Sequence, residues 1–210
     1  MLFFLEKKKN LNRQLETLRK KSYSIEFIII KFRGMVGNIL WMLFEMVTIL
    51  LIISAALLIH ELGHAIGIVV KNKKAMAEVY MGSLSKEKKL KLSLGRITCY
   101  ITIALSGVCR ILNESELPPL TNKQRIIFVA GGPIASLFGF GILYLISHFV
   151  PGVMGIAINR VAFVSLITFF LTGIPYHYPA FFKHVSGYQS DGLYILNIIR
   201  DMKNQSKVVS

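Results

Sequence analysis

Three stretches of the chain are almost wholly apolar, and each is long enough to cross a lipid bilayer as a helix. A helix rises about 1.5 Å per residue, so roughly 20 apolar residues span a hydrocarbon core of about 30 Å. The first stretch is the longest, and Pro151 and Gly152 separate the other two. The pattern predicts about three transmembrane helices, at 39–70, 126–150 and 153–174.

Between the first two stretches, the apolar residues change to a period of two. The alternating apolar residues are Leu90, Leu92, Leu94, Ile97, Cys99, Ile101 and Ile103, and Thr98, Tyr100 and Thr102 lie between the later ones. Alternation with β-branched residues is typical of strands, and 77–81 is a candidate partner strand. The sequence therefore predicts a small β-sheet at about 76–104 in a mainly α-helical protein.

The composition favours a membrane protein. Of the 210 residues, 53% are hydrophobic and 17% are charged, which indicates one polytopic membrane domain and argues against a soluble two-domain enzyme. The formal charge of +14 lies mostly beside the apolar stretches, in 1–33 and 71–125. Basic segments in such places contact anionic lipid headgroups, and no nucleic-acid-binding motif is present. We expect the lipid bilayer as a partner and no nucleic acid.

The two ends of the chain differ from this apolar part. Residues 1–37 are basic, and we expect them to form an interfacial amphipathic helix or a partly disordered tail. The apolar start at 1–5 is too short for the core of a signal peptide, and the basic cluster follows it, so no cleaved signal is expected. Residues 200–210 are expected to be a C-terminal tail.

The first apolar stretch contains the sequence His60-Glu61-Leu62-Gly63-His64, which matches the H-E-x-x-H pattern of zinc enzymes. Residues four apart share one face of a helix, about 6 Å apart along its axis, so the two histidines can bind one metal ion. Glu61 borders that ion without ligating it, which suits a base that takes a proton from water. Zinc lowers the pKa of such a water to about 7. Since ionisable groups at membrane depth are costly and usually functional, the motif predicts a catalytic zinc site.

Small residues form one face of the second apolar stretch. They are Gly131, Gly132, Ala135, Ser136 and Gly139. Faces of this kind let helices approach closely in membranes. We expect this face to pack against the helix that carries the two histidines.

Three segments of the chain resemble those of the site-2 proteases, a family of intramembrane zinc metalloproteases. They are His60-Glu61-Leu62-Gly63-His64, then Gly131-Gly132-Pro133-Ile134-Ala135-Ser136, and then Ser190-Asp191-Gly192. In that family the third zinc ligand is the Asp of an Asp-Gly pair, which corresponds to Asp191. The second segment is similar to the family's Gly-Pro-x-x-Asn element, with Ser136 in place of the more usual Asn.

The resemblance implies a mainly α-helical polytopic membrane protein with a small membrane-associated β-sheet directly after the zinc-binding helix. The metalloprotease domain would occupy 38–199 and bind one Zn²⁺ per chain through His60, His64 and Asp191. Glu61 would act as general base in cleaving a single-span membrane protein or a membrane-associated peptide, within or near the bilayer. We expect an integral protein of a prokaryotic plasma membrane, with its active site near the cytoplasmic face because the basic segment 71–125 stays inside.

A physical argument also points to Asp191, because catalytic zinc sites normally use three protein ligands. The other candidates are His148, His177 and His184. His148 lies near the far end of the second stretch, about 33 Å of helix from the zinc side. Of the rest, Asp191 alone stands between a small residue and a glycine, where the backbone can turn and aim a carboxylate. The competing interpretation is that Ser190 and Asp191 form an ordinary helix N-cap.

Two other interpretations of the histidine motif stay open. A soluble-type zinc peptidase would take its third ligand from a glutamate such as Glu78 or Glu87, although the apolar stretch argues against it. A non-catalytic membrane protein of the same fold would bind or sequester a peptide, for example in immunity or signalling.

For a peptidase, we expect the substrate to bind as an added β-strand. An extended segment exposes the carbonyl groups that a helix hides, and an open sheet edge offers it backbone partners. The sequence predicts this edge beside 90–103. The expected contact residues are Ile97, Thr98, Tyr100 and Thr102.

Overall fold

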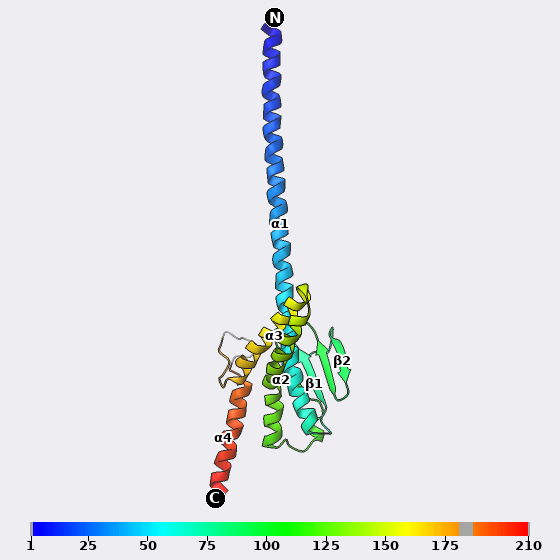
Figure 1. Ribbon diagram of the computed structural model, residues 1–210, viewed down its shortest axis with the longest axis vertical. Helices are drawn as coiled ribbons and strands as arrows, with labels where there is room; N and C mark the ends of the chain where they lie inside the picture. The colour runs from blue at the N-terminus through cyan, green and yellow to red at the C-terminus, as the bar shows by residue number, and fades with distance from the viewer. Residues whose placement is uncertain (1, 181–186, 210) are drawn as a thin grey trace. The chain divides into compact units, whose positions relative to one another are not determined.

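The computed structural model is mainly helical and contains one four-stranded sheet (Figure 1). It describes residues 2–180 and 187–209, and the side chains of Lys31, 34–180 and 187–205. The helices are α1 (Leu2–Lys71), α2 (Asn122–Phe149), α3 (Gly152–Gly173) and α4 (Asp191–Val209), with a short 3-10 turn η1 (Glu114–Glu116). The strands are β1 (Ala77–Met81), β2 (Leu90–Leu94), β3 (Ile97–Ile101) and β4 (Gly107–Ile111).

The chain divides into two units, Met1–Thr48 and Ile49–Ser210. The first unit consists of the N-terminal part of α1, and residues 2–37 of the expected interfacial segment belong to that helix. Most side chains of this segment lie outside the described residues, so its interfacial character stays a prediction. The second unit contains the rest of α1, the sheet and helices α2 to α4. Its last helix continues through most of the expected tail at 200–210.

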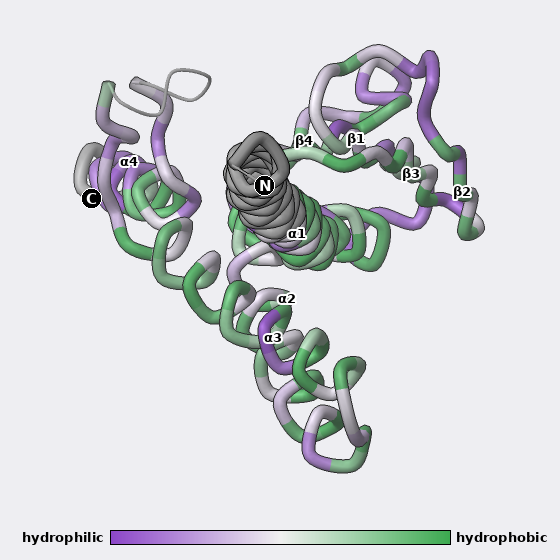
Figure 2. The backbone as a smooth tube through the Cα atoms, turned by 90° about the horizontal axis from the view of Figure 1, so that it is seen from above, coloured by the Kyte–Doolittle hydropathy of each residue, from purple (hydrophilic) through white to green (hydrophobic). Residues whose placement is uncertain are grey.

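Among the described residues, three helical segments are long and apolar enough to cross a membrane. They are Gly34–Lys71 within α1, α2 and α3. Figure 2 shows that hydrophobic residues dominate α2 and α3, whereas β2 and the segment before it include hydrophilic stretches. The prediction of three helices of membrane-spanning length at 39–70, 126–150 and 153–174 is therefore confirmed, with ends that differ by a few residues.

The sheet has the strand order β2-β3-β1-β4. β1 lies parallel to β3 and antiparallel to β4, while β2 and β3 form an antiparallel hairpin. The alternation at 90–103 predicts β2 and β3, and β1 is the candidate partner strand at 77–81. Strand β4 lies beyond the predicted β region. The sequence did not predict it, because Gly107–Ile111 has a single charged residue and no clear period of two. The missed strand forms one of the two sheet edges.

One face of the sheet packs on the C-terminal part of α1. Ala77 and Val79 of β1 and Cys99 of β3 are buried against this helix, in a core that includes Ala65 and Ile68. These three sheet residues share one face because side chains alternate along a strand. In Figure 1 the sheet and α2 lie on opposite sides of this part of α1. The histidine-bearing segment is thus enclosed between two packed layers.

Arg96, in the turn between β2 and β3, joins the sheet to the end of α1. Its guanidinium donates hydrogen bonds to the carbonyl oxygens of Val69 at 2.7 Å, Asn72 at 2.8 Å and Ala75 at 3.2 Å. The last carbonyls of a helix have no partner within the helix, so a side-chain donor satisfies them. This contact fixes the hairpin to the helix that carries the histidines.

Helix α2 approaches α1 at backbone distance. A Cβ atom at Gly63 would lie 2.2 Å from the carbonyl oxygen of Gly131, and one at Gly131 would lie 2.2 Å from that of Gly63. A Cβ at Gly132 would lie 2.4 Å from Nε2 of His64. The expected packing of the small-residue face against the histidine helix is confirmed, and it brings α2 into contact with the imidazoles.

Candidate metal centre

The two histidines of the motif are buried, and their Nε2 atoms are 3.1 Å apart. Nδ1 of His64 is 2.9 Å from the carbonyl oxygen of Phe128, and Nδ1 of His60 is 3.0 Å from the hydroxyl of Ser136. A carbonyl oxygen only accepts, so Nδ1 of His64 donates, and Nε2 keeps its lone pair when the ring is neutral. The Ser136 hydroxyl can accept from His60 in the same way. Both imidazoles are therefore anchored by one nitrogen and direct the other to a shared point.

Asp191 completes the cluster. Its Oδ2 lies 3.3 Å from Nε2 of His60 and 3.6 Å from Nε2 of His64. One potential ligand atom from each of the three residues lies within 4.8 Å of the others. Imidazole nitrogen and carboxylate oxygen are ligands that zinc prefers.

The carboxylate of Asp191 has an oxygen that nothing else satisfies. Oδ2 is buried and has no hydrogen-bond partner among the described residues. Burying an unsatisfied polar atom costs about 1–3 kcal/mol, and more when the group is charged. A cation held by this oxygen and the two Nε2 lone pairs would remove that cost, so the three residues fit a divalent metal.

Ser190 explains why this carboxylate is free to face the histidines. Its hydroxyl oxygen accepts hydrogen bonds from the backbone N–H of Leu193 at 3.2 Å and of Tyr176 at 3.1 Å. The same hydroxyl donates to the carbonyl oxygen of Ile174 at 2.7 Å. The N-cap role of the competing interpretation therefore falls to Ser190. Asp191, the first residue of α4, is held in place without using its own carboxylate.

Glu61 is buried beside this cluster and lies against strand β4. A Cβ atom at Gly107 would lie 2.6 Å from Cγ of Glu61 and 3.0 Å from its Oε1. The backbone N–H of Cys109 also donates toward the Glu61 carboxylate. Gly107 and Cys109 were not predicted as site residues, because their strand was not recognised and only the sheet order brings its edge to α1. A larger residue at 107 would displace the predicted base.

The alternative candidates for the third metal ligand do not join this cluster. Nδ1 of His148 is 2.8 Å from the carbonyl oxygen of Tyr144, on an exposed part of α2. His177 is exposed and pairs with Gln189 through its backbone, and Glu87 is exposed. His184 lies outside the described residues. Among the residues that are described, the group able to hold a metal is that of His60, His64 and Asp191.

Glu78, the ligand expected for a soluble-type zinc peptidase, belongs to a separate cluster on the sheet. Its Oε1 accepts from Nζ of Lys86 at 2.8 Å and from the hydroxyl of Tyr100 at 3.4 Å, and its Oε2 accepts from the hydroxyl of Tyr80. The rings of Tyr80 and Tyr100 stack, with centroids 5.0 Å apart. Burial raises the pKa of Glu78, but the donors from Lys86 and Tyr80 outweigh it, so the pKa is lowered overall.

The strand expected to receive the substrate is in the interior of the sheet. Ile97, Thr98 and Tyr100 belong to β3, which pairs with β1 on one side and with β2 on the other, and Thr102 follows it. An added strand cannot form a ladder beside β3. The two open edges are those of β2 and β4, and β4 is the edge that contacts Glu61.

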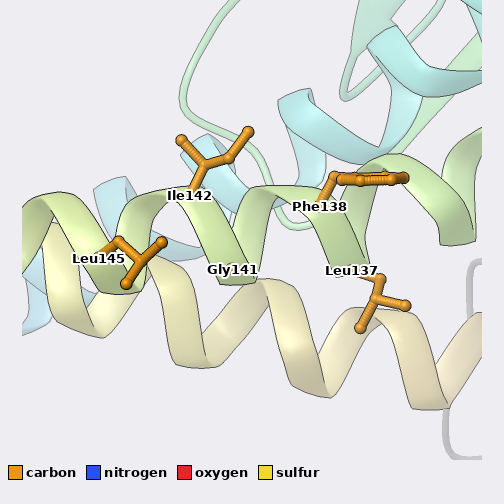
Figure 3. Close-up of a pocket in the computed structure, with 5 residues that line it drawn as sticks. All are labelled: Leu137, Phe138, Gly141, Ile142 and Leu145. Atoms are coloured by element: carbon orange, nitrogen blue, oxygen red, sulfur yellow. The ribbon is translucent and has the colours of Figure 1, made fainter.

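The second unit contains cavities of different character. One, of about 630 Å³, reaches Asp191 and Cys109 and is lined by β4, η1, α2 and the start of α4. Another, of about 390 Å³, lies along α2 (Figure 3). Its lining is Leu137, Phe138, Gly141, Ile142 and Leu145, with no polar side chain. The first cavity therefore touches the candidate centre at Asp191, while the second has no group that can bind a metal or carry a proton.

No protein-family model matches the chain, and no curated protein matches it. The chemistry of His60, Glu61, His64 and Asp191 is therefore the basis for assigning a function.

Proposed function

We propose that the protein is a membrane-embedded zinc endopeptidase of the site-2 protease type. One observation carries the proposal. The buried Oδ2 of Asp191 lacks a hydrogen-bond donor and lies 3.3 and 3.6 Å from the two Nε2 atoms of the H-E-x-x-H motif. A glutamate follows the first histidine and is buried in the same place, as peptide hydrolysis requires.

The chain's own residues have distinct roles in this proposal. His60 and His64 would hold Zn²⁺ through Nε2, and Asp191 would hold it through its carboxylate. Ser136 and the carbonyl of Phe128 fix the orientation of the two rings, as outer-shell partners of metal ligands commonly do.

When bound, zinc supplies Lewis-acid activation, which lowers the pKa of a water molecule to about 7. Glu61 takes a proton from the attacking water and passes it to the amine that leaves when the peptide bond breaks. The carboxylate is suited to this role because it is buried, beside the ligands and not among them.

The substrate would bind in an extended conformation along the free edge of β4. This edge has backbone donors and acceptors that no neighbouring strand uses, and such edges accept added strands. Gly107 leaves room for the Glu61 carboxylate at the same edge. A peptide paired there would present a carbonyl group next to the base.

The three helices of membrane-spanning length define the setting of the reaction. The substrate would be a single-span membrane protein or a membrane-associated peptide, cleaved within or near the bilayer. The active site would lie near the cytoplasmic face of a prokaryotic plasma membrane, and the basic residues at 71–125 support this orientation because basic loops stay inside.

The decisive experiment compares the wild-type protein with Glu61→Gln in lipid nanodiscs. Single-span peptides are incubated with each protein, with and without a chelator, and zinc content is measured on the same samples. Glu61→Gln should keep its zinc, because Glu61 is not a ligand, and lose about 10²- to 10⁴-fold in cleavage rate, the usual contribution of a general base. The matched control is Glu78→Gln, which removes a buried carboxylate away from the centre and should keep both zinc and cleavage.

Unchanged cleavage by Glu61→Gln, or by protein stripped of zinc, would contradict the proposal. Zinc bound without cleavage of any peptide would favour the alternative, a non-catalytic protein that binds or sequesters a peptide.

A further inference from the structure

The cavity beside the metal centre carries two arginines that have no anionic partner. Arg110 extends from β4 and Arg125 from the first turn of α2, and both line the cavity of about 630 Å³ that reaches Asp191. The carboxylates of Asp191 and Glu78 pair with other residues, Asp191 with the two histidines and Glu78 with Lys86. Neither guanidinium is used in another contact among the described residues.

The charge of this cavity is positive once the metal centre is formed. Glu114 of η1 also lines the cavity and offsets one of the two arginines. Asp191 is the other acid in the lining, but its Oδ2 faces the two imidazoles and is used in the centre. Gln189 and Tyr194 add polar groups to the lining. The cavity therefore has one uncompensated positive charge and further hydrogen-bonding groups beside it.

We propose that this cavity binds a carboxylate of the peptide substrate, either an Asp or Glu side chain or a free chain end. The inference deepens the proposed function and rests on it. A guanidinium offers a planar pair of N–H donors that matches a carboxylate, and such charge-assisted pairs are among the stronger hydrogen bonds. The two arginines thus select an acidic peptide over a neutral one.

The position of Arg110 also indicates how far the acidic group of the substrate lies from the cleaved peptide bond. Arg110 directly follows Cys109, whose N–H donates toward Glu61. An extended chain advances about 3.3 Å per residue, so a peptide along β4 brings its carboxylate to Arg110 roughly one to three residues from the cleaved bond.

A lipid headgroup would compete for the same guanidinium groups. The peptide is favoured because the cavity is bounded by Asp191, Phe128 and Val129 and so lies next to a candidate metal ligand.

The test uses the non-cleaving Glu61→Gln protein in zwitterionic nanodiscs and three labelled octapeptides of one sequence. The first has a central Glu and an amidated end, the second a central Gln and a free carboxylate end, and the third a central Gln and an amidated end. Binding is measured by fluorescence anisotropy. At least one of the first two should bind about tenfold more tightly than the third, and the one that does identifies the side chain or the chain end as the ligand.

Arginine variants locate the effect. Arg110→Gln and Arg125→Gln should each remove most of the tenfold preference and leave the third peptide unaffected. The matched control is Lys123→Gln, because Lys123 is exposed in the same turn as Arg125 and does not line the cavity. The comparison of peptides on the unaltered cavity decides the question even if an arginine variant misfolds.

Equal binding of all three peptides would overturn the inference, and so would an equal loss in Lys123→Gln. A preference that disappears in nanodiscs containing phosphatidylglycerol would also overturn it, in favour of a lipid headgroup. A carboxylate preference without cleavage by the wild-type protein would keep the inference and contradict the hydrolase. Cleavage by the wild-type protein without a carboxylate preference would support the hydrolase and overturn the inference.

Discussion

Two carboxylates in the same unit of the chain, those of the buried Glu78 and the partly buried Asp191, differ in how their oxygens are satisfied. Both oxygens of Glu78 accept hydrogen bonds, from Lys86 and from two tyrosines. The buried Oδ2 of Asp191 has no donor and faces two imidazole nitrogens instead. The oxygens of Glu78 are therefore satisfied by the protein itself. The Oδ2 of Asp191 is satisfied only when a cation binds between it and the imidazoles.

The comparison shows that burial alone does not identify a functional acid. The partners of Glu78 lie on the sheet and on the loop that follows β1, so the cluster ties neighbouring segments together. The partners of Asp191 come from α1, and their rings are in turn anchored by α2. A carboxylate that meets several donors stabilises structure, whereas one whose buried oxygen faces two imidazole nitrogens is arranged to bind a metal.

The largest expected effect is that of Asp191→Asn. A neutral amide is a poor zinc ligand, so zinc affinity should fall by more than about hundredfold, beyond the range seen for outer-shell changes, and cleavage should fall with it. Zinc content measured by mass spectrometry on protein equilibrated with a metal buffer checks this. The matched control is Glu78→Gln, which should keep wild-type zinc affinity.

Full zinc occupancy in Asp191→Asn, with losses in His177→Ala or His184→Ala, would transfer the third-ligand role to a histidine. It would also remove the contrast between the two carboxylates.

A smaller effect is expected for Ser136→Ala. The change removes the hydroxyl that is 3.0 Å from Nδ1 of His60, so the ring loses its anchor and zinc affinity should fall about 10- to 100-fold. Ser165→Ala is the control, because Ser165 is equally buried and its hydroxyl bonds only to the carbonyl of Val161 within α3. Equal zinc affinities in the two variants would show that Ser136 serves packing alone.

The smallest effect is expected for Glu78→Gln, and it concerns stability instead of metal. Loss of the charge-assisted hydrogen bonds should lower the free energy of unfolding by about 1–3 kcal/mol at pH 7. The pKa of Glu78 is lowered from its ordinary 4.5 in the folded protein, so its contribution is present above that value. It is lost as the pH falls through the lower folded pKa.

Denaturant titrations of both proteins at pH 7 and under acidic conditions measure this contribution. The stability difference between wild type and Glu78→Gln should shrink on acidification. A difference that grows at low pH would mean that the donors around Glu78 do not favour its charged form.

The sequence predicts the elements of this protein better than their arrangement. The apolar stretches identify three long helices and the alternation at 90–103 identifies two strands, because both periodicities are local. The segment 77–81 was singled out as a candidate partner strand for them. Strand β4 has no such signal, and sheet order depends on contacts between distant segments. The expected receiving edge at Thr98 and Tyr100 is therefore interior.

For the candidate site, too, the sequence predicts what lies on one helix better than what depends on the packing of several elements. The spacing of His60, Glu61 and His64 is a property of one helix, so the sequence alone predicts their shared face. Asp191 could be singled out from its setting between Ser190 and a glycine, but the N-cap alternative stayed open, because only the folded chain shows which residue bonds to Leu193. The contact of Ser136 with His60 and that of Gly107 with Glu61 needed the packing of three elements around α1.

The order of the three candidate ligands along the chain has a consequence for biosynthesis. A ribosome makes His60 and His64 first and reaches Asp191 only after α2 and α3, on the order of ten seconds later. A nascent chain at any earlier stage lacks the third ligand and cannot form the complete centre. In the proposed zinc peptidase, hydrolytic activity would therefore begin only when all three membrane-spanning segments have been synthesised, which would protect other membrane proteins near the site of insertion from premature cleavage.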